Sequence, residues 1–143
     1  MEASAFLEPL KPYFAAFAER DSSRRVELLA QCMTPDAEIW GPNRLFSGYA
    51  EISGKIEGFH NNWRGCRLVL ASGLNTFKNA ARFGNAIVRA DDSVLASGHT
   101  VVELAPDGRI CRVLPFWEAL PPLPDSWPGS LAVPTQGNVP SVA

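Results

Sequence analysis

The segment "SGHTVVELAPDGRICRVLPFWE" (97–118) contains two apolar-rich stretches joined by a short polar turn. Apolar and polar residues alternate on both sides of the turn, and a period of two is typical of β-strands. Pro106 presets the backbone angle φ, and Gly108 accepts a positive φ, so the turn predicts a β-hairpin. Counting from this turn, the second strand should turn Cys111, Val113 and the residues at 115 and 117 inward.

Strand-like alternation extends through the second half of the chain. It predicts four β-strands, at residues 66–77, 80–90, 93–105 and 109–120. Clusters of turn-forming residues separate these strands from one another.

The first half of the chain has helical spacing instead. Apolar residues recur every three or four positions from Phe6 to Phe17 and again over residues 47–63, which predicts two amphipathic helices. Asp21 is a typical N-cap for a further helix, expected to bury Val26, Leu29 and Met33.

A short strand is predicted between the second and third helices. Thr34-Pro35 ends the second helix, and "DAEIW" (36–40) then has the alternation of a strand that stops at Gly41-Pro42. Helices followed by strands predict an α+β fold, with the helices packed on one face of a mostly antiparallel sheet.

Four stretches, taken in this order, carry a resemblance to a known family: "YFAAFAERD" (13–21), "MTPDAEIWGP" (33–42), "FSGYAEISGKIEGF" (46–59) and the hairpin at 97–118. Together they resemble the nuclear transport factor two-like superfamily, which includes ketosteroid isomerases and SnoaL-like polyketide cyclases. The resemblance implies a cone-shaped, cystatin-like α+β roll over residues 1–120. In such a roll, three N-terminal helices pack on a curved, mostly antiparallel sheet and leave an apolar pocket open at one end.

The last part of the chain differs in composition. Residues 121–143 hold half of the twelve prolines and show no period, which predicts a proline-rich C-terminal tail. The tail is either loose or strapped over the domain through Trp127 and Leu131.

Charge and composition indicate which partners and compartment to expect. Net charge is −2 and no basic cluster exceeds Arg24-Arg25, so we expect no nucleic-acid partner. No segment approaches the roughly 20 apolar residues of a membrane span, and the N-terminus does not resemble a signal peptide. The three cysteines are odd in number and widely spaced, which favours a reduced, cytoplasmic compartment.

The resemblance also implies where catalytic groups would lie. Ketosteroid isomerases place one hydroxyl donor on the first helix, a base near the end of the first strand and a second donor on a later strand. The matching positions here are Tyr13, Gly41 and Thr100. A base must reach the proton that it removes, and a glycine cannot do so. Asp36 and Glu38 share one face of their strand, and Gly41 lies on the other. The resemblance makes the Gly41 face the inward one, so we expect neither carboxylate to replace the base.

His60 is the predicted general base. It follows Ile56 by four residues, so it can share the pocket-facing side of its helix, and its ordinary pKa near ~6.5 suits proton transfer. The alternative is a surface or capping histidine beside Asn61. The resemblance implies an inward position for Thr100, so its neighbour His99 should point outward. Two histidines without clustered cysteines or carboxylates predict no metal site, and the expected acid–base chemistry uses no cofactor.

The predicted pocket would take a small, mostly apolar organic molecule. Apart from the predicted catalytic groups, its lining is expected to comprise Phe17, Ile39, Ile56, Phe59, Trp63, Asn85, Val113 and Trp117. The functions left open are a cofactor-free isomerase, cyclase or dehydratase, a non-catalytic ligand-binding module, and a dimerising interaction domain. Leu114 and Phe116, on the outer face of the last strand, predict a covered surface. The resemblance implies that a second copy of the chain covers it, because members of this superfamily often dimerise through their sheets, so we expect a homodimer.

Overall fold

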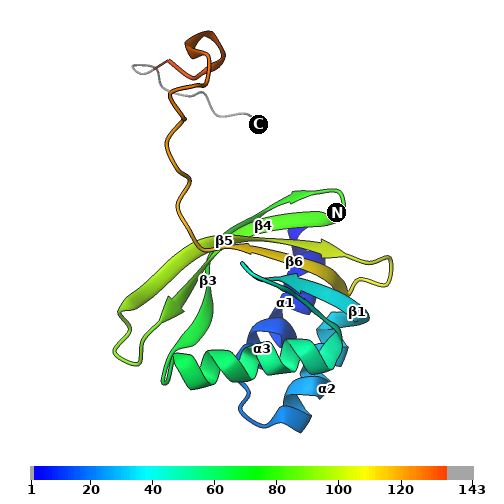
Figure 1. The fold of residues 1–143 in the computed structure, drawn as a ribbon. Helices are drawn as coiled ribbons and strands as arrows, with labels where there is room; N and C mark the ends of the chain where they lie inside the picture. The colour runs from blue at the N-terminus through cyan, green and yellow to red at the C-terminus, as the bar shows by residue number, and fades with distance from the viewer. Residues whose placement is uncertain (1, 135–143) are drawn as a thin grey trace.

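In residues 2–134, which the computed structural model describes, six β-strands form one curved sheet that packs against three α-helices (Figure 1). The elements follow one another as α1 (Ala3–Ala18), α2 (Ser22–Cys32), β1 (Met33–Trp40), β2 (Leu45–Ser47), α3 (Gly48–Asn62), β3 (Arg67–Phe77), β4 (Ala80–Val88), β5 (Val94–Leu104), β6 (Ile110–Phe116) and the 3₁₀ helix η1 (Gly129–Leu131). The fold is α+β and cystatin-like, as predicted. No helix in this part of the chain is both long and apolar enough to cross a membrane.

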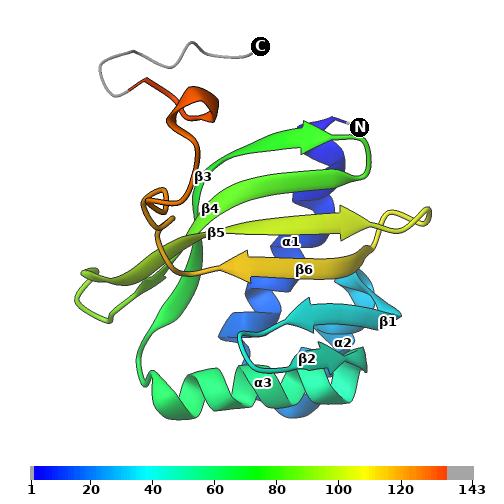
Figure 2. The same cartoon turned by 45° about the horizontal axis from the view of Figure 1, so that its top comes forward.

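The order of the strands in the sheet determines where a cavity can form. The order is β2-β1-β6-β5-β4-β3, and β1 pairs with β6 in parallel while the other neighbours are antiparallel. Helix α3 therefore carries the chain from the β2 edge to the β3 edge of the sheet. Figure 2 shows this helix crossing beside the sheet, with α1 behind the strands. The following strands then lead back to β1.

The predicted hairpin is present as β5 and β6. Gly108 has a φ of +86°, and the Ala105 N–H donates to the Arg109 carbonyl oxygen (2.8 Å), so the turn has the geometry that its residues favour. The predicted register of the second strand is partly wrong. A bulge after Glu103 leaves Cys111 as an extra residue, so Ile110 and Val113 are both buried while Cys111 is only half-buried.

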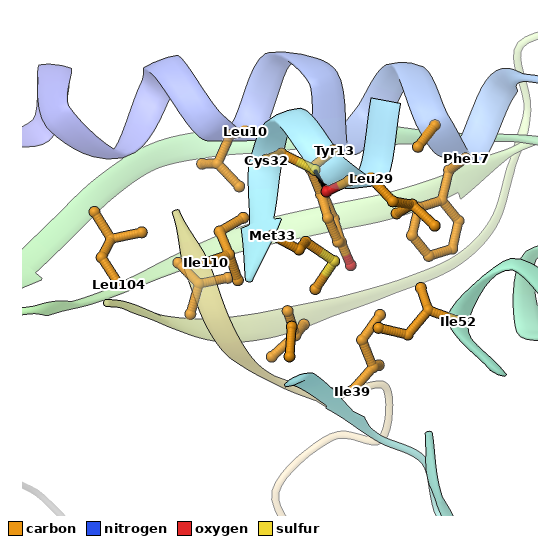
Figure 3. Close-up of a cluster of buried hydrophobic side chains, with 14 of the residues drawn as sticks. Leu10, Tyr13, Phe17, Leu29, Cys32, Met33, Ile39, Ile52, Leu104 and Ile110 are labelled. Atoms are coloured by element: carbon orange, nitrogen blue, oxygen red, sulfur yellow. Dashed lines mark hydrogen bonds between the residues drawn. The ribbon is translucent and has the colours of Figure 1, made fainter. Parts of the chain in front are cut away.

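The main core lies between the three helices and the inner face of strands β1, β4, β5 and β6. Figure 3 shows Leu10, Tyr13 and Phe17 projecting from α1 toward side chains of α2 and β1. These residues and Phe6 belong to the predicted helical stripe and are buried, whereas Phe14, its remaining member, is only partly buried. Ala37 and Ile39 of β1 are buried as well, whereas Asp36 is exposed, so the predicted faces of this strand are confirmed.

Two boundaries in this region differ from the prediction. Strand β1 begins at Met33, directly after α2, so it includes Thr34-Pro35. The sequence analysis also missed β2, whose three residues pair with the end of β1 through Ile39 and Phe46. Three residues are too few to show a period of two, so alternation alone could not reveal this strand.

Helix α2 buries an arginine rather than the expected valine. Asp21 caps the helix as predicted, because its Oδ1 accepts from the Ser23 N–H (2.9 Å). Val26, however, is exposed, and Arg25 is only 1% exposed. Leu29 is buried as predicted, so the helix is turned slightly from the expected orientation.

The buried guanidinium of Arg25 connects three segments. Its Nε donates to the Glu19 carbonyl (3.0 Å), and Nη1 donates to the Ser53 carbonyl and hydroxyl oxygens (3.2 Å each). Its Nη2 donates to the Arg20 carbonyl (3.3 Å) and to Glu57 Oε2 (3.0 Å). All five N–H groups of the guanidinium therefore have an acceptor, which compensates for burying the charge. Arg25 ties the α1–α2 turn to α3.

Beyond β6, the chain leaves the sheet. Figure 1 shows the part up to residue 134 extending away from the strands. Trp127 and Leu131 remain exposed, and the Trp127 Nε1 donates to the Leu131 carbonyl (3.0 Å). The described part of the tail is therefore not strapped over the domain through these residues, and the rest of the predicted tail, 135–143, lies outside the described residues.

Replacing Arg25 should destabilise the protein strongly. Arg25→Met keeps an apolar stem but leaves the carbonyl groups of Glu19, Arg20 and Ser53 without their donor. We expect the free energy of unfolding to fall by about 2–3 kcal/mol, measured by urea denaturation. Arg24→Met is the matched control, because Arg24 is exposed and, among residues 2–134, pairs with Glu19 alone, at 3.6 Å. The free energy of unfolding of Arg24→Met should stay within about 0.5 kcal/mol of the wild-type value. Equal losses in the two variants would contradict the role given to Arg25.

Candidate functional site

A cavity of about 630 Å³ lies between α3 and the sheet. Eight of the predicted site residues line it: Tyr13, Phe17, Ile39, Phe59, Trp63, Asn85, Thr100 and Trp117. The other lining residues, none of which was in the predicted lining, are Pro42, Phe46, Gly54, Lys55, Gly58, Asn62, Leu68, Ile87, Ala96 and Pro115. The wall is therefore mainly apolar and aromatic, with a few polar groups at separate points.

Asn85 and Thr100 form the polar part of the sheet wall. They lie on the neighbouring strands β4 and β5, and they are 4% and 1% exposed. The Asn85 Nδ2 donates to Thr100 Oγ1 (2.9 Å). The other end of the amide, Oδ1, is buried and has no hydrogen-bond partner among residues 2–134. Leaving a buried acceptor unpaired costs about 1–3 kcal/mol, so this oxygen is suited to accept a hydrogen bond from a ligand.

Tyr13 brings a hydroxyl group from the helical side. Its side chain is buried, and Figure 3 shows the hydroxyl pointing away from α1, toward the side where Ile39 and Ile52 lie. Burial raises the pKa of Tyr13 far above its ordinary value, and the nearby Cys32 thiol adds to the rise. The group therefore stays protonated at neutral pH and can donate a hydrogen bond.

Helix α3 forms the opposite wall with two glycines and a lysine. Gly54 and Gly58 are one turn apart, and a Cβ added to either would have no atom within 4 Å. A glycine inside a helix costs about 1 kcal/mol relative to alanine. Here the two glycines leave space on the cavity side of the helix, beside Lys55.

His60 does not line this cavity, and its predicted placement is wrong. It lines a separate hollow of about 320 Å³ together with Arg20, Arg25, Glu57, Asn61 and Arg64. The reason is helical geometry. At about 100° per residue, the buried Ile52 and Ile56 point to the core, residues 54, 55, 58 and 62 lie on one side of that stripe, and His60 lies on the other.

Two predicted wall residues are in the core instead. Ile56 and Val113 are fully buried and belong to the main hydrophobic cluster. They support the wall from behind without lining the cavity. His99 is exposed and Thr100 is buried, so the predicted orientation of these two neighbours is confirmed.

The comparisons with known proteins gave matches only at the level of structure. No protein-family model matches the chain, and no curated protein matches it. A SnoaL-like protein from Agrobacterium tumefaciens strain C58, for which an isomerase activity is proposed, matches with a TM-score of 0.74 and 29% identity. The match covers 81% of this chain and 99% of that one.

Two further solved structures have the same fold. A protein of unknown function with a cystatin-like fold, from Methylobium petroleophilum PM1, has a TM-score of 0.66 and 17% identity, covering 89% of this chain and 83% of its own. A SnoaL-like protein from Jannaschia sp. CCS1, a proposed polyketide cyclase, has a TM-score of 0.62 and 12% identity, covering 79% and 85%. The chain therefore has the fold of SnoaL-like and nuclear transport factor two-like proteins.

An aromatic ring fills the space next to Gly41, the position implied for the base. A Cβ added to Gly41 would lie 3.2 Å from Cε2 of Phe46 and 3.1 Å from the Arg44 carbonyl oxygen. Phe46 itself lines the cavity. A carboxylate side chain at position 41 would therefore require the Phe46 ring to move.

Lys55 is the functional candidate that the sequence analysis missed. It lies between Gly54 and Gly58 in helix α3. Glycines at positions i and i+4 lie on one face of a helix, and this spacing is the signal that could have identified a cavity wall there. Lys55 is close to that face, and burial lowers the pKa of its ammonium group.

The position of His60 predicts a pH dependence of stability. Burial lowers the pKa of His60 in the folded protein, and the positive charges of Arg20 and Arg25 lower it further. As pH falls below about 6.5, the ordinary pKa of histidine, the unfolded chain takes up a proton that the folded protein resists. The free energy of unfolding of the wild type should therefore decrease as the pH falls through this range. The His60→Gln variant should lose less unfolding free energy over the same range, as measured by urea denaturation at each pH.

His99→Gln is the matched control for this experiment, because His99 is exposed on β5 and is the chain's other histidine. In this variant, the free energy of unfolding should change with pH as steeply as in the wild type. If the free energy of unfolding depends on pH equally in the wild type and in His60→Gln, the environment assigned to His60 is wrong.

Proposed function

We propose that this protein binds a small, mostly apolar organic molecule in the cavity between α3 and the sheet. The observation that carries the proposal is the unpaired Oδ1 of Asn85, a buried acceptor on the wall of an otherwise largely apolar cavity. A ligand with an N–H or O–H group could donate to this oxygen. The hydroxyl groups of Thr100 and Tyr13 could donate to an oxygen of the same ligand.

A cofactor-free isomerase, cyclase or dehydratase is the second candidate. Two hydroxyl donors in one cavity favour it, since Tyr13 and Thr100 both contribute to the lining and could stabilise a developing enolate. Among the described lining residues, however, there is no aspartate, glutamate or histidine to act as a base. Lys55 is the remaining titratable group apart from Tyr13. Binding therefore has better support than catalysis.

The thiols support a cytoplasmic location as part of the proposal. Cys32, Cys66 and Cys111 are all free, and burial raises the pKa of the Cys32 thiol to about 12. Free thiols persist in a reducing compartment. The high pKa of Cys32 makes it unreactive at neutral pH.

Replacing Asn85 should weaken ligand binding without closing the cavity. A thermal-shift screen with small apolar molecules finds ligands of the wild type, because a ligand at about 100 times its Kd stabilises the folded state by about 2.7 kcal/mol. For such a ligand, Asn85→Leu should raise the Kd about tenfold, since one buried hydrogen bond is lost. Asn75→Leu is the matched control, on an exposed site of β3 outside the cavity.

A second variant tests whether the ligand occupies the cavity. Gly58→Leu places a side chain into open space on the cavity wall, so it should keep the fold and abolish binding. Unchanged affinity in both Gly58→Leu and Asn85→Leu would refute the proposed site.

We also propose that the outer face of the sheet forms a homodimer. Phe116 of β6 is 57% exposed, and Trp40 of β1 is also exposed, so an apolar surface is available next to Leu114. Exposed apolar surface of this kind favours association. Light scattering should give twice the mass of one chain, and Phe116→Asp should give a monomer. A monomeric wild type at micromolar concentration would count against this interface.

A further inference from the structure

The cavity wall contains one charged group and, among the described residues, no carboxylate. Lys55 is the only aspartate, glutamate, lysine, arginine or histidine that the lining includes in residues 2–134. An apolar cavity with a single positive charge attracts negative charge more strongly than the same charge in open solvent, because the surrounding dielectric constant is lower.

Lys55 forms no ion pair with any carboxylate in the described part of the chain. The carboxylate at the spacing of a common helix ion pair is Glu51, one helical turn before Lys55. Glu51 is engaged elsewhere: its Oε1 accepts from the Ser47 N–H (2.9 Å) and lies 3.5 Å from Arg44 Nη2. Glu57, two residues later, binds Arg25 at 3.0 Å. The ammonium group is thus left without a counter-charge.

The ring of Phe46 holds the ammonium group beside the cavity. The Lys55 Nζ lies 4.9 Å from the centroid of this ring, and the guanidinium carbon of Arg44 lies 4.2 Å from it. Both distances fit cation–π contacts. Phe46 and Lys55 line the cavity, whereas Arg44 does not. Within residues 2–134, Arg44 pairs with Glu51 but Lys55 pairs with no carboxylate.

We propose that the ligand of this cavity is an apolar organic acid, whose anionic group pairs with Lys55 while its apolar body contacts the aromatic wall. This inference rests on the proposed binding function and narrows its ligand class. Burial makes the unpaired ammonium group costly, as the lowered pKa of Lys55 indicates, and an acid group would compensate for that cost. A charged hydrogen bond in such a site is worth more than an exposed ion pair.

Two fluorescent probes that share one apolar body can test the charge requirement. 8-Anilinonaphthalene-1-sulfonate is an anion, and N-phenyl-1-naphthylamine is its neutral counterpart. We expect the wild type to bind the sulfonate more tightly. Lys55→Met should weaken sulfonate binding by about tenfold or more and leave binding of the neutral probe unchanged. Lys55→Arg keeps the charge and should retain most of the affinity for the sulfonate.

Lys78→Met is the matched control, because the Lys78 Nζ also lies over a phenylalanine ring, 5.7 Å from the Phe77 centroid, but outside the cavity lining. It should bind both probes like the wild type. To extend the test to carboxylates, 1-naphthylacetate should displace the bound sulfonate better than 1-naphthylacetamide, and Lys55→Met should remove the difference.

The outcomes separate the two proposals. If Gly58→Leu abolishes binding of both probes but Lys55→Met leaves the sulfonate affinity unchanged, the cavity binds ligands without an acid subsite, and the inference is overturned while the binding function stands. If Gly58→Leu affects neither probe, the probes do not bind in the cavity; the proposed function then fails, and the inference fails with it.

Discussion

The parallel pairing of β1 with β6 joins the helical first half of the chain to the stranded second half. In the register of these strands, Ile39 lies opposite Val113, and the residues are far apart in sequence. The cavity depends on this pair, because Ile39 forms one part of its wall and Pro115 and Trp117, at and just after the end of β6, form another. Closing so long a loop costs entropy, which the burial of both strands against the helices must offset.

Three sides of helix α3 make different contacts. Ile52 and Ile56 anchor it in the core, the side with Gly54 and Gly58 leaves space for a ligand, and Glu57 pairs with the buried Arg25. The position of the cavity therefore depends on how the helix is rotated about its axis. The contacts of Arg25 with Ser53 and Glu57 help to fix that rotation, although they lie outside the cavity itself.

The sequence predicted those features that depend on local patterns. The hairpin followed from its turn residues, and Tyr13 and Phe17 followed from the spacing of one helical stripe. Features that depend on tertiary geometry were missed. The wrong placement of His60 arose because a stripe facing the core was assumed to face the cavity, and the burial of Arg25 requires acceptors from segments distant in sequence. The bulge beside Cys111 changed a register that alternation alone could not correct.

The open space above Gly54 and Gly58 has a consequence for how such a protein can change during evolution. A side chain added at either position meets no other atom within 4 Å at its Cβ, and alanine would also favour the helix. Mutations at these two sites can therefore narrow the cavity in small steps while the sheet and the core stay as they are. Changes in ligand preference at these sites therefore do not reduce the stability of the fold, and new specificities can arise without compensating mutations at other positions.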